Sequence, residues 1–160
     1  EERAKKTNHL VATNGVVIVK NPAINVVSSD VRLSFDIRSP NDDDRLQALA
    51  EIKYKISAIS KRRGVTTSIK IGHEACAAPC DEILMQALQN SALSCGIKTL
   101  NLSSGAGHDA MSFHGAIPLA MLFLRCKDGI SHHPEESIIP QDIALATQVL
   151  INMIENIKDI

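Results

Sequence analysis

The amino-acid sequence predicts an α/β protein in two parts, residues 1–72 and residues 73–160. Segments rich in β-branched residues alternate with segments whose apolar residues recur every three or four positions, and these are the periods of strands and helices. A run of small residues, from Gly72 to Pro79, separates two regions of different pattern. In the second region helices and strands alternate, which favours a parallel sheet covered by helices.

The first part begins with the end of a helix and continues into strands. Residues 1–9 are mostly charged or polar and fit a helix tail, whereas residues 10–20 contain a run of β-branched residues typical of a strand. Asn21-Pro22 predicts a turn. Residues 31–38 alternate between apolar and polar, so we expect a strand with one core face. That face would consist of Val31, Leu33, Phe35 and Ile37.

A helix and a third strand complete the first part. Asn41 and the acidic residues after it suit a helix N-terminus, where side-chain oxygens and negative charge are favourable. Lys61-Arg62-Arg63 followed by Gly64 predicts the end of that helix. Residues 65–71 are predicted to be a strand. The apolar face of the helix would be Leu46, Leu49, Ile52, Ile56 and Ile59.

The second part is predicted to alternate helix and strand. A helix over residues 81–95 is stopped by Gly96, and a short strand follows at residues 97–102. A second strand is expected at residues 119–124. Pro140 is suited to the first position of a last helix. The core face of that helix would be Ile143, Ala146, Leu150, Ile154 and Ile157.

Composition excludes several classes of function. The chain has 160 residues, a net charge of −1 and 2% aromatic residues, so it offers neither a basic surface nor stacking platforms for nucleic acid. No apolar run approaches the ~20 residues of a membrane span. The four cysteines are too sparse for a disulfide framework and favour free thiols in a reducing compartment, the cytoplasm.

Two polar loops carry the residues best suited to chemistry. The glycine loop, residues 103–109, combines two glycines that let a ligand approach the backbone with a histidine that can donate a proton, although it could be only a tight turn. The second is Ser131-His132-His133-Pro134, where one imidazole could bind a metal or both could be solvated surface groups. Glu135 and Glu136 could orient an imidazole or cap a turn.

Other polar residues have ordinary explanations beside functional ones. Arg38 ends the polar face of a strand, where it could bind a carboxylate through two hydrogen bonds or form a surface ion pair. Asn25 could bind a ligand or form a turn. His73 with Cys76 and Cys80 lacks a fourth zinc ligand, so a structural zinc site is not favoured.

Three motifs in order resemble a known family. The first is Asn25-Val-Val followed by Phe35-Asp-Ile-Arg38-Ser-Pro, the second is Ser104-Gly-Ala-Gly-His-Asp-Ala110, and the third is Gly129-Ile-Ser-His-His-Pro-Glu-Glu136. Together they resemble the amidase, hydantoinase and carbamoylase group of the M20 metallopeptidase-like hydrolases. That group includes allantoate amidohydrolase, N-carbamoyl-L-amino acid hydrolase and β-ureidopropionase. The resemblance runs from about Leu10 to the C-terminus and covers the C-terminal part of the family's pattern.

The resemblance implies a fold and a set of site residues. Residues 1–72 would be an incomplete ferredoxin-like lid, or dimerisation, domain, and residues 73–160 the C-terminal part of an α/β metallohydrolase catalytic domain. His132 matches a metal ligand of the family, and His108 matches a catalytic residue that stabilises the tetrahedral intermediate. The matched substrate-binding residues are Asn25, Arg38 and Gly107.

The resemblance also implies cofactors, a substrate class and partners. The family uses two divalent metal ions, zinc or manganese, to hydrolyse a C–N bond in a small carbamoyl, ureido or amide substrate. It forms homodimers through the lid domain. The remaining metal ligands of the family pattern, including a His-x-Asp motif, do not occur in this sequence. We therefore expect the chain to be part of a larger hydrolase and to be inactive by itself.

Two other functions remain open. The chain could be a non-catalytic module for dimerisation or for binding small carboxylates. It could also belong to an M20 amidase that acts on acylated amino acids, although the glycine loop argues against this. Stoichiometric zinc or manganese binding would distinguish an enzyme from a dimerisation module.

Overall fold

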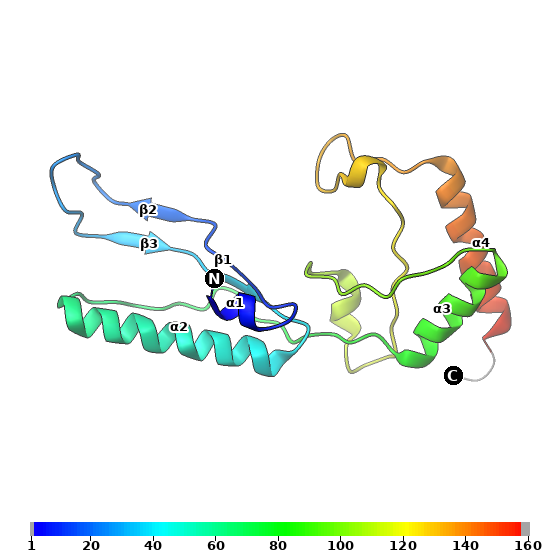
Figure 1. Ribbon diagram of the computed structural model, residues 1–160, viewed down its shortest axis with the longest axis horizontal. Helices are drawn as coiled ribbons and strands as arrows, with labels where there is room; N and C mark the ends of the chain where they lie inside the picture. Colours follow the sequence, from blue (N-terminus) through cyan, green and yellow to red (C-terminus); the bar gives the residue numbers. More distant parts are fainter. Residues whose placement is uncertain (1, 158–160) are drawn as a thin grey trace. The chain divides into compact units, whose positions relative to one another are not determined.

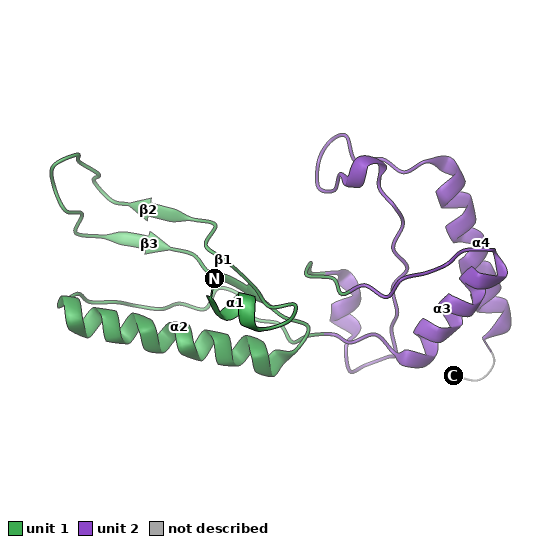
Figure 2. Cartoon of the chain, viewed as in Figure 1, with its two compact units in different colours: residues 1–77, 103–107 green, residues 78–102, 108–160 purple. Residues whose placement is uncertain are grey.

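The computed structural model describes residues 2–157, and their contacts divide the chain into two compact units (Figure 2). The first unit comprises the chain up to Ala77 together with Ser103–Gly107, and the second comprises the remaining residues. The first contains α1 (Glu2–Lys6), β1 (Val11–Thr13), β2 (Val17–Val19), β3 (Val31–Leu33), β4 (Asp36–Arg38) and α2 (Asp42–Arg63). The second contains α3 (Glu82–Ser94), the 3₁₀ helices η1 (Asp109–Phe113) and η2 (Lys127–Gly129), and α4 (Pro140–Asn156) (Figure 1).

The strands of the first unit form two antiparallel pairs. β1 pairs with β4, so that Val11 lies opposite Arg38 and Thr13 opposite Asp36. β2 pairs with β3. The strand predicted over residues 31–38 is therefore two strands with different partners. Ser34 occupies the break, where its hydroxyl accepts a hydrogen bond from the Val16 backbone N–H at 3.0 Å and its carbonyl accepts one from Asn14 at 2.7 Å.

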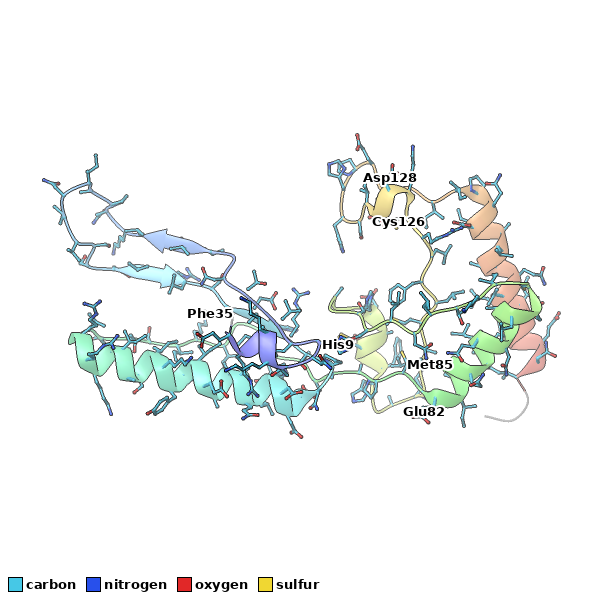
Figure 3. The ribbon with its side chains drawn as sticks, viewed as in Figure 1. His9, Phe35, Glu82, Met85, Cys126 and Asp128 are labelled. Carbon is cyan, nitrogen blue, oxygen red and sulfur yellow. The ribbon has the colours of Figure 1, made fainter. Side chains whose placement is uncertain are left out.

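Of the expected core face of residues 31–38, Ile37 is half-buried and the other three residues are exposed. Val31, Leu33 and Phe35 are each 50% exposed, and Phe35 lies at the change of strand partner (Figure 3). A strand buries a full face only when another layer covers it. Here each three-residue strand has a single hydrogen-bonded neighbour, and the alternation of apolar residues leaves a half-exposed surface.

The helix of the first unit ends where the sequence predicts. The Asn41 side chain accepts a hydrogen bond from the Asp43 backbone N–H at 2.9 Å, and Gly64 closes the helix with a φ of 66°. Positive φ is the conformation in which glycine carries no steric penalty. Of the predicted apolar face, Leu49, Ile52 and Ile56 are half-buried, while Leu46 and Ile59 are exposed; Ala48 is buried.

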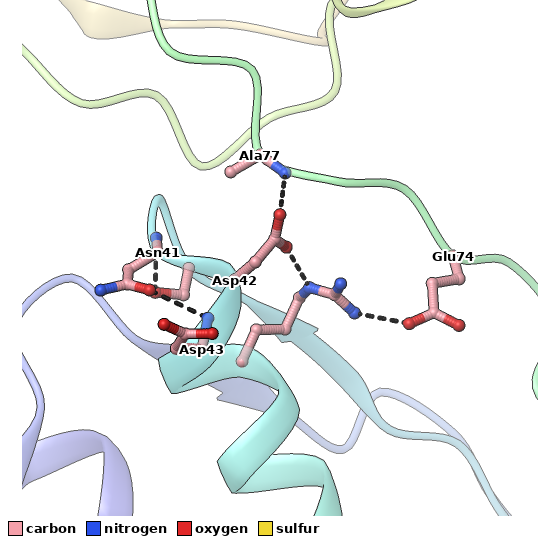
Figure 4. Close-up of polar contacts among 7 residues, drawn as sticks. Asn41, Asp42, Asp43, Glu74 and Ala77 are labelled. Atoms are coloured by element: carbon pink, nitrogen blue, oxygen red, sulfur yellow. Dashed lines mark hydrogen bonds and ion pairs between the residues drawn. The ribbon is translucent and has the colours of Figure 1, made fainter.

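A polar network fixes the segment after residue 72 to the start of α2 (Figure 4). Arg45, whose side chain is 14% exposed, donates to Asp42 at 2.9 Å and to Glu74 at 3.0 Å. The other Asp42 oxygen accepts the Ala77 backbone N–H at 3.0 Å. These bonds, to Glu74 first and then to Asp42, raise the pKa of Arg45 above its ordinary value. The network explains why residues up to Ala77 belong to the first unit.

In the second unit α3 packs against α4. Their buried residues are Leu88, Ala92 and Val149, with Leu122 and Met153 partly buried beside them. Asp81 caps α3 by accepting the Leu84 backbone N–H at 2.9 Å, and Pro140 is the first residue of α4, as predicted. The predicted core face of α4 is only partly correct, because Ala146 and Ile157 are half-buried, whereas Ile143, Leu150 and Ile154 are exposed and Val149 is the buried residue. The helix is apolar on more than one side, so periodicity by itself did not select the packed side.

Three predicted strands are not formed. Residues 65–71, 97–102 and 119–124 carry no strand pairing, and among residues 2–157 every strand pair is antiparallel. The expected parallel sheet is therefore not present in the described chain. A strand requires a hydrogen-bonded neighbour, and a bond from the Asp81 N–H to the Leu119 carbonyl at 2.7 Å joins the last of these segments to the start of α3 instead. No helix within residues 2–157 combines the length and the apolar character that crossing a membrane requires.

Candidate functional site

Arg38 is held by three hydrogen bonds within the first unit. Its Nε donates to Asp36 Oδ1 at 2.9 Å, and its Nη2 donates to Asp36 Oδ2 at 2.5 Å. Its Nη1 donates to the Gly105 carbonyl at 2.8 Å, across 67 residues of sequence. The structure thus brings the predicted arginine beside the predicted glycine loop. We call Asp36, Arg38 and Gly105 the arginine anchor.

The Asp36–Arg38 contact is an ion pair with both side chains 52% exposed. The hydrogen bond from Arg38 lowers the pKa of the Asp36 carboxyl below its ordinary value, and the same bond raises the pKa of Arg38. Both groups are therefore charged at neutral pH. The surface ion pair that the sequence left open is present, and the guanidinium remains half accessible to solvent.

The glycines of the loop are not required by the packing of the chain. A Cβ placed on Gly105 or Gly107 would meet no described atom within 4 Å, and neither residue has positive φ. Glycine is normally retained for close approach or for positive φ. The packing of the described residues therefore does not explain either glycine, and the substrate contact expected for Gly107 stays a prediction.

Asn25 lies at the end of the β2–β3 hairpin, in the two-residue turn between the bridged residues Ala23 and Val26. The turn role that the sequence left open is therefore present. Neighbouring Ile24 and Val27 are almost fully exposed, at 109% and 94%. No hydrogen bond of the described residues joins Asn25 to Arg38, which belongs to the other strand pair and bonds to Asp36 and Gly105.

His108 belongs to the second unit and precedes η1, whose Met111 N–H donates to the His108 carbonyl at 2.9 Å. Its imidazole meets the Phe123 ring edge to face, with ring centres 5.5 Å apart and planes at 63°. Such aromatic contacts orient a ring. The residues expected to form a buried strand thus supply a support for the predicted catalytic histidine.

His132 lies in a loop whose backbone is held in an uncommon conformation. We call residues 126–137 the histidine loop; its ends are joined by a bond from the Lys127 N–H to the Ser137 carbonyl at 2.8 Å. Figure 3 marks Cys126 and Asp128 at η2, where the loop begins. His132 has a φ of 56°, and its backbone N–H donates to Glu136 Oε2 at 2.7 Å.

The Glu136 carboxylate of the histidine loop accepts hydrogen bonds from a backbone N–H and from a thiol. Glu136 accepts the His132 N–H and lies 3.7 Å from the Cys126 thiol, so it caps the turn. The backbone N–H of Glu135 donates to Nδ1 of His133 at 3.2 Å, which places the proton of a neutral His133 on Nε2. The turn-capping role is therefore the one that the structure supports for Glu136.

The described residues do not assemble a metal site. Among residues 2–157, no group of three or more His, Cys, Asp or Glu side chains is placed to hold a metal ion. That set includes His73, Cys76 and Cys80, and all four cysteines are free thiols. His132 is exposed and could supply one ligand, but one ligand does not fix an ion.

Sequence reasoning assigned no role to Asp36, the residue that holds Arg38 in place. Asp36 precedes Arg38 by two positions, so both side chains lie on the same face of β4, and this spacing was a usable signal. Glu136 was recognised, but its bond to the His132 backbone depends on a left-handed conformation that no sequence pattern at a histidine predicts.

Comparisons with known proteins agree on one class, the amidohydrolases and carbamoylases. Allantoate deiminase 2 of Glycine max is 33% identical over 158 residues, covering 93% of this chain and 32% of the relative. N-carbamoyl-L-amino acid amidohydrolase of Geobacillus stearothermophilus is 30% identical, covering 96% and 38% respectively. A solved amidase of the hydantoinase/carbamoylase family from Burkholderia multivorans matches with a TM-score of 0.85 at 27% identity, covering 95% of this chain and 37% of that one.

The family itself is shown by a match to the sequence model of peptidase family M20/M25/M40 over residues 6–156. The chain belongs to this family. Its mixed helix and strand structure resembles those of the amidohydrolase and carbamoylase members. The chain spans about a third of the length of the curated relatives it matches.

Proposed function

We propose that this chain is part of a hydrolase that cleaves a C–N bond in a small carbamoyl or ureido compound bearing a carboxylate. The observation that carries the proposal is the arginine anchor. Guanidinium has five N–H donors, and the three bonds to Asp36 and Gly105 leave one N–H on each terminal nitrogen of Arg38. Two adjacent donors on a half-exposed arginine suit a carboxylate.

The other residues receive roles that follow from their positions. Gly107 offers open backbone beside the arginine anchor. His108, oriented by Phe123, would donate a hydrogen bond to the oxygen that becomes negative as the carbonyl is attacked. Asn25, on the exposed turn of the hairpin, would contact substrate through its side-chain amide. Residues 1–72 would form the lid domain and residues 73–160 the C-terminal part of the catalytic domain.

Metal ions and a dimer are also part of the proposal. The reaction would use two divalent ions, zinc or manganese, and His132 would supply one ligand. Because the described residues offer no complete metal site, residues 1–160 by themselves are expected to release no product. The lid would pair two copies of the protein, which light scattering of the full-length protein would detect as twice the monomer mass.

The test is hydrolysis by the full-length protein of allantoate, ureidoglycolate and an N-carbamoyl-L-amino acid, followed as ammonia release. We expect at least one to be turned over, with a loss of about a hundredfold in kcat/KM in Arg38→Ala and in His108→Ala. Arg32→Ala, which removes an exposed arginine of β3, is the matched control and should retain activity. Turnover that is unaffected in both site variants would overturn the residue assignment.

Binding without turnover would give a different conclusion. If the full-length protein binds N-carbamoyl-glycine through Arg38 but releases no ammonia with any divalent metal, the non-catalytic carboxylate-binding function is correct. The arginine anchor favours carboxylate binding whether or not the protein is an enzyme. The N–H donors of Arg38 can bind a carboxylate even if the bound compound is not hydrolysed.

A further inference from the structure

The strand face that carries Arg38 contains one anionic neighbour. Asp36 and Arg38 are two residues apart on β4, so their side chains lie on the same side of the sheet. The residues opposite them on β1 are Thr13 and Val11, which carry no charge. Asp36 is therefore the group on this strand pair that can hold the guanidinium by charge.

The contact uses one specific edge of the arginine. Asp36 accepts from Nε and Nη2, the two nitrogens on the side edge of the guanidinium. A planar guanidinium fixed along one edge cannot rotate about its last bonds, so the direction of its remaining N–H groups is set. The Gly105 carbonyl then fixes Nη1 at 2.8 Å. The two remaining hydrogens, one on Nη1 and one on Nη2, are the donors left for a ligand.

We propose that Asp36 is a positioning residue, which holds Arg38 so that its remaining donors receive the carboxylate of the substrate. This inference rests on the proposed function of Arg38 and adds a residue that does not itself contact substrate. Asp36 orders a side chain that otherwise has many rotamers, and it does so before the ligand arrives. It also consumes the side edge of the guanidinium, so a substrate carboxylate must approach the terminal nitrogens.

Charge and order have opposite effects on binding, and the structure indicates which is larger. The negative charge of Asp36 reduces the attraction of Arg38 for a second carboxylate. Both groups are half exposed, so water and salt screen that repulsion strongly. The ordering effect is screened less, because it acts through two short, directional hydrogen bonds at 2.9 and 2.5 Å. Removing Asp36 should therefore weaken binding of a carboxylate substrate.

The experiment compares the full-length protein with Asp36→Ala and Asp36→Glu on two substrates. One substrate is an N-carbamoyl-L-amino acid, and the other is the same compound with its carboxylate converted to a neutral amide. We expect D36A to raise KM for the acid about tenfold with kcat within twofold, and to leave KM for the amide unchanged. D36E retains a carboxylate and should recover part of the loss. Asp30→Ala, which removes another exposed carboxylate of the first unit, is the control.

A second measurement reports the position of Arg38 directly. The side-chain Nε–H of Arg38 should give an ordered ¹⁵N resonance in the unmodified protein and in D30A, and should lose that order in D36A. An ordered Arg38 in D36A, or an equal rise in KM for acid and amide, would overturn the inference. No hydrolysis by the unmodified protein would instead count against the proposed function, and hydrolysis with an unchanged KM in D36A would count against Asp36.

Discussion

The arginine anchor and the histidine loop hold their functional residues in different ways. Arg38 is fixed through its side chain, by Asp36 and the Gly105 carbonyl. His132 is fixed through its backbone, by the Glu136 carboxylate. The first arrangement sets the direction of the donors that a ligand meets. The second arrangement fixes the backbone of His132. It does not fix the orientation of the imidazole, which a bound ligand or metal would determine.

The difference has a physical origin in the elements that carry the two residues. Arg38 belongs to a strand, whose regular spacing places Asp36 on the same face. His132 belongs to a loop and has a left-handed φ of 56°, a conformation that is uncommon for residues other than glycine. A substitution should therefore affect side-chain order in the first region and backbone conformation in the second. Four substitutions test the stability of the core and then these two regions.

The largest effect on stability is expected from Val149→Ala, which changes the buried residue of α4. Val149 is 1% exposed, and removing two methyl groups from a packed site costs about 2 kcal/mol. Urea unfolding, together with hydrogen exchange of the amides in α3 and α4, should show the loss of stability. The side chain of Arg38, which belongs to the other unit, should remain ordered. Ile154→Ala, at a position 72% exposed, should change stability little. Equal losses in both variants would mean that α4 packs through a different face.

Glu136→Ala should release the backbone of the histidine loop. It removes the charged acceptor of the His132 N–H, a loss of about 1 kcal/mol at an exposed site. The amide of His132 should then exchange about fivefold faster. Glu135→Ala is the matched control, because the Glu135 carboxylate lies 4.0 Å from His133 and accepts no described backbone N–H in the loop. Faster exchange in both variants would show that the charge of the loop matters rather than the bond.

His132→Gly should separate function from stability. Glycine adopts a φ of 56° without the strain that a side chain carries there, about 1–2 kcal/mol, but it also gives the unfolded chain more freedom, about 0.4–1 kcal/mol. Stability should therefore stay the same or rise by up to about 1.6 kcal/mol, as measured by urea unfolding, while the proposed hydrolysis is lost. A clear loss of stability would show that the imidazole packs against the protein.

The smallest effect is the pH dependence of the arginine anchor. The hydrogen bond from Arg38 lowers the pKa of folded Asp36 below the unfolded value of about 3.9. The anchor therefore stabilises the fold above about pH 4, and the contribution is lost as pH falls through the lower pKa of the folded state. The stability difference between the unmodified protein and Asp36→Asn should be larger at pH 6 than at pH 2.5. In a protein that carries Arg38→Ala, the effect of Asp36→Asn on stability should no longer differ between pH 6 and pH 2.5.

The helix ends and the family could be predicted from the sequence. The caps of α2 at Asn41 and Gly64, and the start of α4 at Pro140, follow from interactions between residues close in sequence. Arg38, the glycine loop and the histidine pair were recognised as motifs, and the family match agrees with the resemblance they suggested. Such features depend on short-range chemistry, which the order of residues contains.

Tertiary structure decided which segments became strands and which contacts hold the site. Residues 65–71 and 119–124 have strand-like sequences but form no strand, because pairing depends on a neighbour that lies elsewhere in the chain. The bond from Arg38 to Gly105 joins positions 67 residues apart. The backbone N–H of His132, whose φ is 56°, donates to the Glu136 carboxylate four residues later. The sequence by itself determined the ends of the helices and supplied the hydrogen-bond donors of the site. The tertiary structure determined their partners, such as the Gly105 carbonyl that accepts from Arg38.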